Sequence, residues 1–185
     1  MSLQIKIIIL CVASIGIAWI SRSSLRDIRS HGFYRFFAWE AILALILLNV
    51  DHWFYQPFRI NQLFSWSLLI TSLFLVIPGI QLLHKAGKQD NRRSEPGLYD
   101  FEKTSELVTT GIYGYIRHPL YSSLLFLGWG VFFKLPSWVG GVLAGLATLF
   151  LWLTARNEEV ENIAYFGSAY QDYMHKTRMF IPFLF

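Results

Sequence analysis

The sequence contains a single cysteine, Cys11, which lies inside the first long apolar run. One thiol cannot form a disulfide within the chain, and it cannot build a cysteine-based metal site. The histidines show no metal-ligand spacing such as H-x-x-x-H, and they stand at His31, His52, His84, His118 and His175. We therefore expect no metal.

Charged residues are also scarce. They make up 15% of the chain, against about 25% in ordinary soluble domains, whereas apolar residues make up 54%. The net charge of +4 does not indicate nucleic-acid binding, because that function needs Lys and Arg clustered on a soluble face. Here the cations stand between apolar runs, which is typical of a membrane protein.

The apolar runs predict an all-α polytopic membrane protein with five transmembrane helices. A bilayer core of about 30 Å requires roughly 20 apolar residues per helix, and somewhat shorter runs also suffice. Glycines on the fourth and fifth runs, such as Gly130 and Gly145, predict close packing of these two helices as a tight antiparallel hairpin. The predicted spans are Leu3–Ile20, Tyr34–Tyr55, Leu63–His84, Tyr115–Phe133 and Ser137–Thr154.

The distribution of Lys and Arg predicts the orientation of these spans. Thirteen of the 16 cations fall in the first and third loops and the C-terminal tail, and the other three are Lys6, Arg59 and Lys134. By the positive-inside rule the C-terminus is cytoplasmic and the N-terminus faces outward. The run Ile5–Ile20 is long for a signal peptide and no A-x-A site follows it, so we expect it to be retained.

The segments between and after the spans complete the predicted organisation. The longest polar stretch is the third loop, Lys85–Gly114. After the fifth span, Asn157–Lys176 has apolar residues at three- and four-residue steps and predicts an amphipathic helix on the cytoplasmic face, bent near Gly167. We expect a single membrane domain with a three-helix part (1–84) and a part containing this loop, the helical hairpin and the tail helix (85–185).

Three polar features need an explanation. Glu40 lies inside the second span, where a carboxylate is costly, and either bonds a neighbouring helix or acts on substrate. Arg117-His118-Pro119 stands where the third loop meets the fourth span, and suits either an anchored helix start or a functional site. The pair Glu158-Glu159 suits a solvated first helical turn when considered alone.

Two of these features occur together in a recognisable pattern. The segment ELVTTGIYGYIRHPLY (106–121), followed after the hairpin by RNEEVENIAYFGSAYQDY (156–173), resembles the isoprenylcysteine carboxyl methyltransferase family. The broader group that it resembles also includes phospholipid N-methyltransferases. The resemblance covers about Glu106 to Pro182, whereas the first three spans match only in hydropathy.

The resemblance implies an S-adenosylmethionine site at the cytoplasmic ends of the last helices. The aromatic faces would stabilise the cofactor's sulfonium, and Glu158 would bind its ammonium group. No G-x-G-x-x-G follows a predicted strand, which excludes a soluble dinucleotide-type cofactor domain. The matched positions are Leu107, Val108, Tyr113, His118, Pro119, Tyr121 and Glu158.

The sequence departs from the family at one position. Prenylcysteine methyltransferases place a substrate-binding arginine four residues before the cofactor glutamate, and here that position is Thr154. The nearest arginine is Arg156, which points about 200° away around a helix. Arg117, Arg156 and Glu40 are therefore the candidates for acting on the acceptor.

The sequence thus predicts methyl transfer from S-adenosylmethionine to a lipophilic acceptor that enters from the bilayer. We favour carboxyl O-methylation of a prenylcysteine-like substrate. Three alternatives stay open: N-methylation of a phospholipid head group, a related membrane reductase that uses a nicotinamide cofactor, and a non-catalytic membrane scaffold.

Overall fold

The computed structural model describes residues 1–87, 98 and 103–182. Within these ranges the chain is helical and has no named strand, which confirms the predicted all-α class. Three short 3₁₀ turns accompany the helices: η1 (Ser24–Arg26), η2 (Val50–His52) and η3 (Gly111–Gly114). The α-helices are α1 (Leu3–Ile20), α2 (His31–Asn49), α3 (Ile60–Ala86), α4 (Pro119–Phe132), α5 (Trp138–Phe166) and α6 (Ser168–Lys176).

Four of these helices are long and apolar enough to cross a membrane: α1, α2 with its η2 extension, α3 and α5. The protein is therefore an integral membrane protein. The fourth predicted span contains α4, which has only 14 residues. By length and composition the described part of the chain thus offers four candidate spans, where the sequence predicts five.

Local sequence signals explain where several helices begin and end. The side chains of Ser2, Ser30 and Ser137 accept hydrogen bonds from backbone N–H groups in the first turns of α1, α2 and α5. Pro119 starts α4, at a position where a helix has no use for the missing N–H. At Gly167 the backbone adopts a φ of +62°, which ends α5 and separates it from α6.

Several predicted boundaries are wrong. The second helix covers His31–Asn49, followed by η2, rather than Tyr34–Tyr55. The fourth helix begins at Pro119 rather than at Tyr115. Residues 115–118 form hydrogen bonds with the segment after α6 (residues 178–182, the C-terminal segment) instead of forming a helix. The fifth helix does not end at Thr154. It continues to Phe166 through the first half of the segment that we predicted as a separate tail helix, and only the bend near Gly167 is as predicted.

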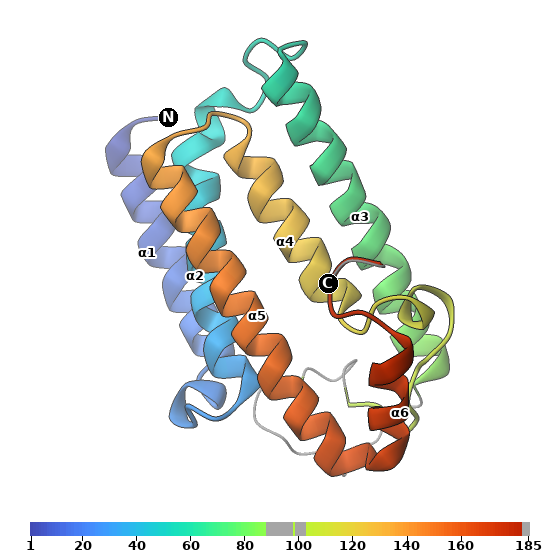
Figure 1. Cartoon of the computed structure of the whole chain (residues 1–185). Helices are drawn as coiled ribbons and strands as arrows, with labels where there is room; N and C mark the ends of the chain where they lie inside the picture. Colours follow the sequence, from blue (N-terminus) through green and yellow to red (C-terminus); the bar gives the residue numbers. More distant parts are fainter. Residues whose placement is uncertain (88–97, 99–102, 183–185) are drawn as a thin grey trace.

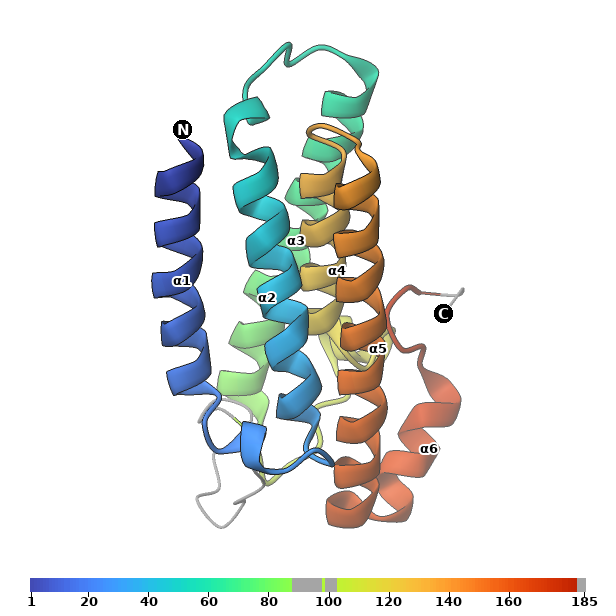
Figure 2. The same ribbon diagram turned by 90° about the vertical axis from the view of Figure 1, so that its left-hand side faces the viewer.

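The helices α2, α3, α4 and α5 form an antiparallel bundle (Figures 1 and 2). Within it, α2 packs mainly on α5, and α3 packs mainly on α4. The short helix α6 folds back beside the C-terminal end of α5 (Figure 2). The N-terminal helix α1 stands outside the bundle against α2 and has no buried residue.

Polar contacts attach α1 to α2. The Ser14 hydroxyl donates to Glu40 Oε2 over 2.6 Å. At the other end of the contact, Asp51 forms ion pairs with Lys6 and with the N-terminal ammonium of Met1. The interhelical hydrogen bond that we considered for Glu40 is therefore present.

The glycines of α4 bring it against a different helix from the predicted one. A Cβ added to Gly130 would lie 2.9 Å from Leu69 Cδ2, so this glycine allows close approach to α3. The Ser65 hydroxyl of α3 also donates to the Gly130 carbonyl over 2.6 Å. A Cβ added to Gly145 on α5 would meet nothing within 4 Å. Gly130 therefore joins α4 to α3. The predicted approach of α4 and α5 is present further along the hairpin, where a Cβ added to Gly140 would lie 3.3 Å from Phe132 Cδ2 of α4.

Candidate active site

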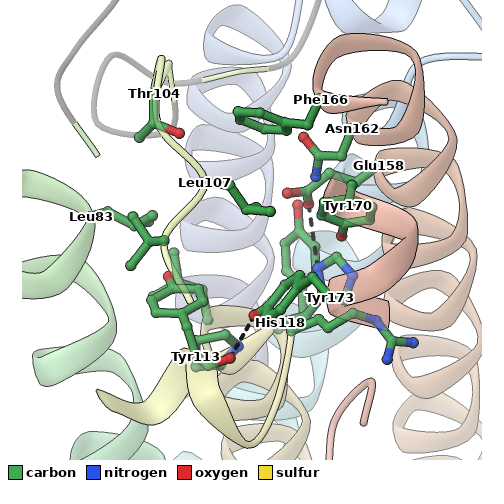
Figure 3. Close-up of a pocket in the computed structure, with 15 residues that line it drawn as sticks. Leu83, Thr104, Leu107, Tyr113, His118, Glu158, Asn162, Phe166, Tyr170 and Tyr173 are labelled. Atoms are coloured by element: carbon green, nitrogen blue, oxygen red, sulfur yellow. Dashed lines mark hydrogen bonds and ion pairs between the residues drawn. The ribbon is translucent and has the colours of Figure 1, made fainter. Parts of the chain in front are cut away.

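One pocket lies at the end of the bundle opposite the α4–α5 connection, and we call this end the pocket end. Its wall comes from the C-terminal end of α3, the segment before α4, the first turn of α4, the second half of α5, and α6 (Figure 3). The residues that line it are Leu83, Thr104, Leu107, Val108, Tyr113, Arg117, His118, Pro119, Leu120, Tyr121, Glu158, Asn162, Phe166, Tyr170 and Tyr173.

The segment before α4 is held in place by the C-terminal segment of the chain. The backbone N–H groups of Arg117 and His118 donate to the carbonyls of Arg178 and Met179 over 2.8 and 3.2 Å. Further along, the Ser122 hydroxyl donates to a carbonyl of the same segment. These bonds replace the helical hydrogen bonds that residues 115–118 do not form, and they fix His118 at the start of α4.

The Arg117 side chain links the segment before α4 to α5 and to the end of α6. Its Nε donates to Glu159 Oε1 over 2.7 Å. Its Nη1 donates to the carbonyls of Thr177 and Met174 over 2.6 and 3.3 Å. Both side chains of the ion pair are nearly buried, 10% exposed for Arg117 and 3% for Glu159. The charge of this arginine is therefore largely compensated inside the protein.

His118 is buried between two carboxylates. Its Nδ1 lies 3.7 Å from Glu158 Oε2, and its Nε2 lies 3.5 Å from Glu159 Oε1. The imidazole stacks on the Tyr121 ring, with centroids 5.4 Å apart. Both N···O distances exceed those of an ordinary hydrogen bond, and Nε2 has no hydrogen-bond partner within the described ranges. Nε2 is buried beside Glu159, which does not line the pocket, whereas Nδ1 lies towards Glu158, which does.

The Glu158 carboxylate lines the pocket. It interacts electrostatically with His118, His31 and Arg35. His31 belongs to the first turn of α2, and Glu161 binds it twice, at Nδ1 over 2.6 Å and at the backbone N–H over 3.1 Å. The start of α2 is thereby attached to α5, next to Glu158.

Tyrosines form the aromatic part of the wall. The Tyr173 hydroxyl donates to the Tyr113 carbonyl over 2.6 Å, and the Tyr113 hydroxyl donates to the Gly79 carbonyl over 3.4 Å. Burial raises the pKa of Tyr173 above the usual value for a phenol. Burial, together with the nearby Glu158 charge, likewise raises the pKa of Tyr170. Both phenols are therefore neutral at physiological pH and can donate a hydrogen bond.

All seven residues predicted for the cofactor line this one pocket, and so does Arg117. The other two candidates for acting on the acceptor lie elsewhere. Glu40 is between α1 and α2, bonded to Ser14. Arg156 borders a separate hollow with Arg178 and neighbouring residues. Within the described ranges, no group of three or more His, Cys, Asp or Glu side chains is arranged to hold a metal ion.

The sequence reasoning missed part of the pocket wall. Asn162 and Phe166 follow Glu158 by four and eight residues and so lie on the same face of α5. This spacing was available within the predicted helix Asn157–Lys176, but the sequence reasoning did not use it. Tyr170 and Tyr173 of α6 reach the pocket because the chain reverses after α5, which periodicity alone does not reveal.

The pocket suits a ligand that carries an ammonium group, an anionic group and a central part that is apolar or positively charged. Glu158 can accept hydrogen bonds from an ammonium group, and the His118 imidazole can donate a ring N–H to an anionic group. The faces of Tyr113 and Tyr121 can stabilise a cation. The remaining wall is mainly apolar and would exclude water from the bound ligand.

Comparison with known proteins is consistent with this arrangement. Residues 60–169, more than half of the chain, match the family described as Phospholipid methyltransferase. The match begins at α3 and ends in α6, so it includes most of the elements that form the pocket. No solved structure gives a significant match.

Three curated proteins are similar in sequence. A Methanethiol S-methyltransferase of Crocosphaera subtropica is 26% identical over 80% of this chain and 55% of its own length. A Protein-S-isoprenylcysteine O-methyltransferase of Schizosaccharomyces pombe is 34% identical over 42% of this chain and 34% of its own length. The protein of the same name from Mus musculus is 30% identical over 65% and 43%. The chain therefore spans about half or less of each of these relatives.

Proposed function

Because the chain belongs to the phospholipid methyltransferase family, we propose that it transfers a methyl group from S-adenosylmethionine to a lipophilic acceptor in the membrane. The observation that carries this proposal is the convergence of all seven predicted cofactor residues on one pocket. We assign the activity to one membrane domain, made of the parts 1–84 and 85–185.

The residues of the pocket fit this cofactor chemically. Glu158 would accept hydrogen bonds from the cofactor's ammonium group, a charge-assisted interaction. His118, which lines the pocket, would bond the cofactor's carboxylate. The rings of Tyr113 and Tyr121 would face the sulfonium. The apolar residues Leu107, Val108 and Pro119 would enclose the remainder.

When bound, the cofactor would supply a methyl group on a positively charged sulfur. The protein's own contribution is to hold the acceptor in line with that methyl group and to exclude water, so proximity accounts for much of the rate. An acceptor carboxylate is ionised at neutral pH and needs no general base. Arg117 lines the pocket, and we propose that it attracts this carboxylate. Arg156 and Glu40 do not line the pocket, and we assign them no step.

Cofactor binding requires the pocket to widen. Its free volume is about 70 Å³, whereas pockets for small ligands usually measure about 300–1,000 Å³. The α6 side of the wall, with Tyr170 and Tyr173, follows α5 directly through Gly167, and Tyr170 stacks on Phe166 of α5. We propose that movement of α6 about Gly167 admits the cofactor and then encloses it.

The acceptor that we favour is a prenylcysteine-like carboxylate, because two of the relatives are named Protein-S-isoprenylcysteine O-methyltransferase. A thiol is the second candidate, because the relative that aligns with 80% of this chain is named Methanethiol S-methyltransferase. A thiol acceptor must lose a proton before it attacks. The family name also keeps the head-group amine of a phospholipid as a third acceptor.

We also propose that all five predicted segments cross the membrane. At roughly 1.5 Å per residue, α4 is about 21 Å long, less than a bilayer core. Non-helical backbone is tolerated at membrane depth where protein covers it, and the segment before α4 is covered by the C-terminal segment. The excess of Lys and Arg supports a cytoplasmic position for the pocket end, and we propose that α6 lies along that face and that the N-terminus is outside.

The decisive experiment measures binding of S-adenosylhomocysteine to the purified full chain. We expect His118→Ala and Glu158→Ala each to weaken binding by about 10- to 100-fold, the cost of losing a hydrogen bond to a charged group. The matched controls are His175→Ala and Asp172→Asn, exposed residues of α6 outside the pocket, and we expect them to bind like the wild type. No binding by a folded wild-type protein would overturn the proposal and favour the scaffold.

A second measurement identifies the acceptor once binding is established. Labelled methyl groups should be transferred to a prenylcysteine as an ester, which alkali releases as methanol. A volatile labelled thioether made from an alkyl thiol would instead support the second candidate. An alkali-stable label in the head group of a phospholipid would support N-methylation.

A further inference from the structure

Arg117 also borders a second hollow at the pocket end, with a volume of about 290 Å³. Three arginines from three segments meet there: Arg117 before α4, Arg156 on α5 and Arg178 after α6. Between them lie Met174, Thr177 and Met179, which give the hollow a partly apolar floor.

The charge of this hollow is not neutralised by the protein. Arg117 is paired with Glu159. Arg156 and Arg178 are exposed, and neither side chain has a hydrogen bond or ion pair to any described residue. The position of Arg178 is nevertheless fixed, because its backbone N–H and carbonyl bond Tyr115 and Arg117 over 3.0 and 2.8 Å. The hollow therefore presents the guanidinium groups of Arg156 and Arg178, which no described carboxylate neutralises, to an anionic ligand.

An apolar groove of about 420 Å³ begins next to this hollow. On α5, Trp152, Leu149 and Gly145 precede Arg156 by four, seven and eleven residues, which places all four on one face of the helix. On the other wall, Phe180 and Ile181 directly follow the segment that carries Arg178. The surface thus changes from cationic to apolar along the helix axis. Because Gly145 has no side chain, the groove stays open there.

The groove is separate from the cofactor pocket. Tyr121 lines the pocket and Phe180 lines the groove. Between them these two residues form a buried cluster with Leu151, Ala155 and Met179. A molecule in the groove therefore lies behind this packed layer and does not reach the pocket.

We propose that the hollow and the groove together bind one anionic phospholipid of the bilayer, which is not the methyl acceptor. Its phosphate would lie between Arg156 and Arg178, where paired guanidinium groups suit phosphate oxygens. One acyl chain would lie along Gly145, Leu149 and Trp152. A cationic hollow that leads into an apolar groove fits an amphiphile, whereas a free phosphate would leave the groove unfilled. The lipid would hold the C-terminal segment, and with it His118, against α5.

The test uses the purified full chain in detergent and native mass spectrometry with phosphatidylglycerol and phosphatidylcholine of identical acyl chains. We expect the wild type to bind phosphatidylglycerol more tightly than phosphatidylcholine. The double variant Arg156→Gln/Arg178→Gln should weaken phosphatidylglycerol binding by about 30-fold, from two lost contacts between arginine and anionic lipid. The control Arg26→Gln/Arg29→Gln makes the same change in net charge in the exposed segment before α2 and should bind like the wild type.

A third variant tests the groove. Gly145→Leu should weaken binding of both lipids, because the added side chain occupies the acyl-chain position, and a Cβ at Gly145 meets no neighbouring atom. Circular dichroism of each variant verifies that the helices are retained.

Three results would overturn the proposal. The first is equal affinity of the wild type for the two lipids, and the second is equal loss in the two double variants. The third is complete displacement of the lipid by inorganic phosphate alone, which would identify a free-anion site. None of these measurements involves S-adenosylhomocysteine, so their failure is distinct from failure of the proposed function.

Discussion

Both ends of the bundle bury a cationic side chain in apolar surroundings, but the hydrogen bonds of the buried polar groups differ between the two ends. At the end where α4 and α5 connect, which we call the hairpin end, Lys134 is 1% exposed. Its Nζ donates to Gln62 Oε1 over 3.1 Å and lies 3.6 Å from the centre of the Trp66 ring. The Gln62 amide in turn donates to the Lys134 carbonyl over 3.0 Å. Lys134 and Gln62 thus form two hydrogen bonds with each other.

At the pocket end the buried polar groups are only partly satisfied. Arg117 and Glu159 form a close pair, but the neighbouring His118 has an Nε2 without a hydrogen-bond partner among the described residues. The side chains of Glu158 and Tyr170 line the pocket (Figure 3). Incomplete satisfaction of buried polar groups is rare in folded proteins and is concentrated at functional sites. Buried polar atoms without a partner among the described residues also occur at the hairpin end, at Asn49 Oδ1 and His52 Nδ1. The pocket lined by His118, Glu158 and Tyr170 is what assigns a ligand-binding role to the polar groups of the pocket end.

The strongest test of this comparison is Glu159→Gln at the pocket end. The substitution leaves the nearly buried Arg117 without a carboxylate, and we expect the free energy of unfolding to fall by about 3 kcal/mol. Affinity for S-adenosylhomocysteine should fall as well, because Glu159 also borders His118. Denaturant unfolding in micelles and ligand titration measure the two effects.

The double variant Arg117→Gln/Glu159→Gln serves as the control for this prediction. It removes both charges, so it should be more stable than Glu159→Gln alone, a non-additivity expected for residues in contact. A single variant as stable as the wild type would show that the pair does not hold the pocket end together.

A smaller effect is expected from Lys134→Ala at the hairpin end. The substitution leaves Gln62 Oε1 buried without a donor, and we expect a loss of about 2 kcal/mol in the free energy of unfolding. Binding of S-adenosylhomocysteine to the folded fraction should stay within about twofold of the wild type, since that change corresponds to well under 1 kcal/mol.

The control here is Lys134→Met, which keeps an apolar stem against Trp66 and should retain more stability than the alanine variant. Lost ligand binding in a folded Lys134→Ala protein would contradict the division of roles between the two ends.

The same two ends show what the sequence alone could predict of the fold. Hydropathy located the four candidate membrane helices of the described ranges, because apolar runs of sufficient length have few other structures open to them. It placed both ends of α1 correctly, since Ser2 and Ser21 flank the run in the sequence and cap the helix in the structure. It did not place the end of α5, because hydropathy marks where the surroundings become polar and the helix continues beyond that point to Phe166.

The motif residues of the candidate site were predictable from the sequence. The residues that they contact in the fold were not. His118 and Glu158 were identified by pattern, and the structure brings them to one pocket. The pairing of residues 116–118 with the C-terminal segment depends on contacts about 60 residues apart, and no local signal specifies them. The approach of Gly130 to α3 was missed for the same reason, because glycine indicates close packing but not the partner.

The smallest loss of stability is expected from a substitution in α6 at the pocket end. Tyr173→Phe removes the hydrogen bond to the Tyr113 carbonyl, and we expect a loss of about 1 kcal/mol in the free energy of unfolding at neutral pH. Burial raises the pKa of Tyr173 in the folded state, so above about pH 10 the unfolded chain gives up a proton that the folded chain keeps. The contribution of the Tyr173 hydroxyl to the free energy of unfolding is therefore complete below pH 10 and is lost as the pH rises further. Unfolding followed from pH 8 to 11 should show a shallower alkaline decline in the variant. Identical slopes would mean that the Tyr173 hydroxyl is solvated and is not part of the closed pocket wall.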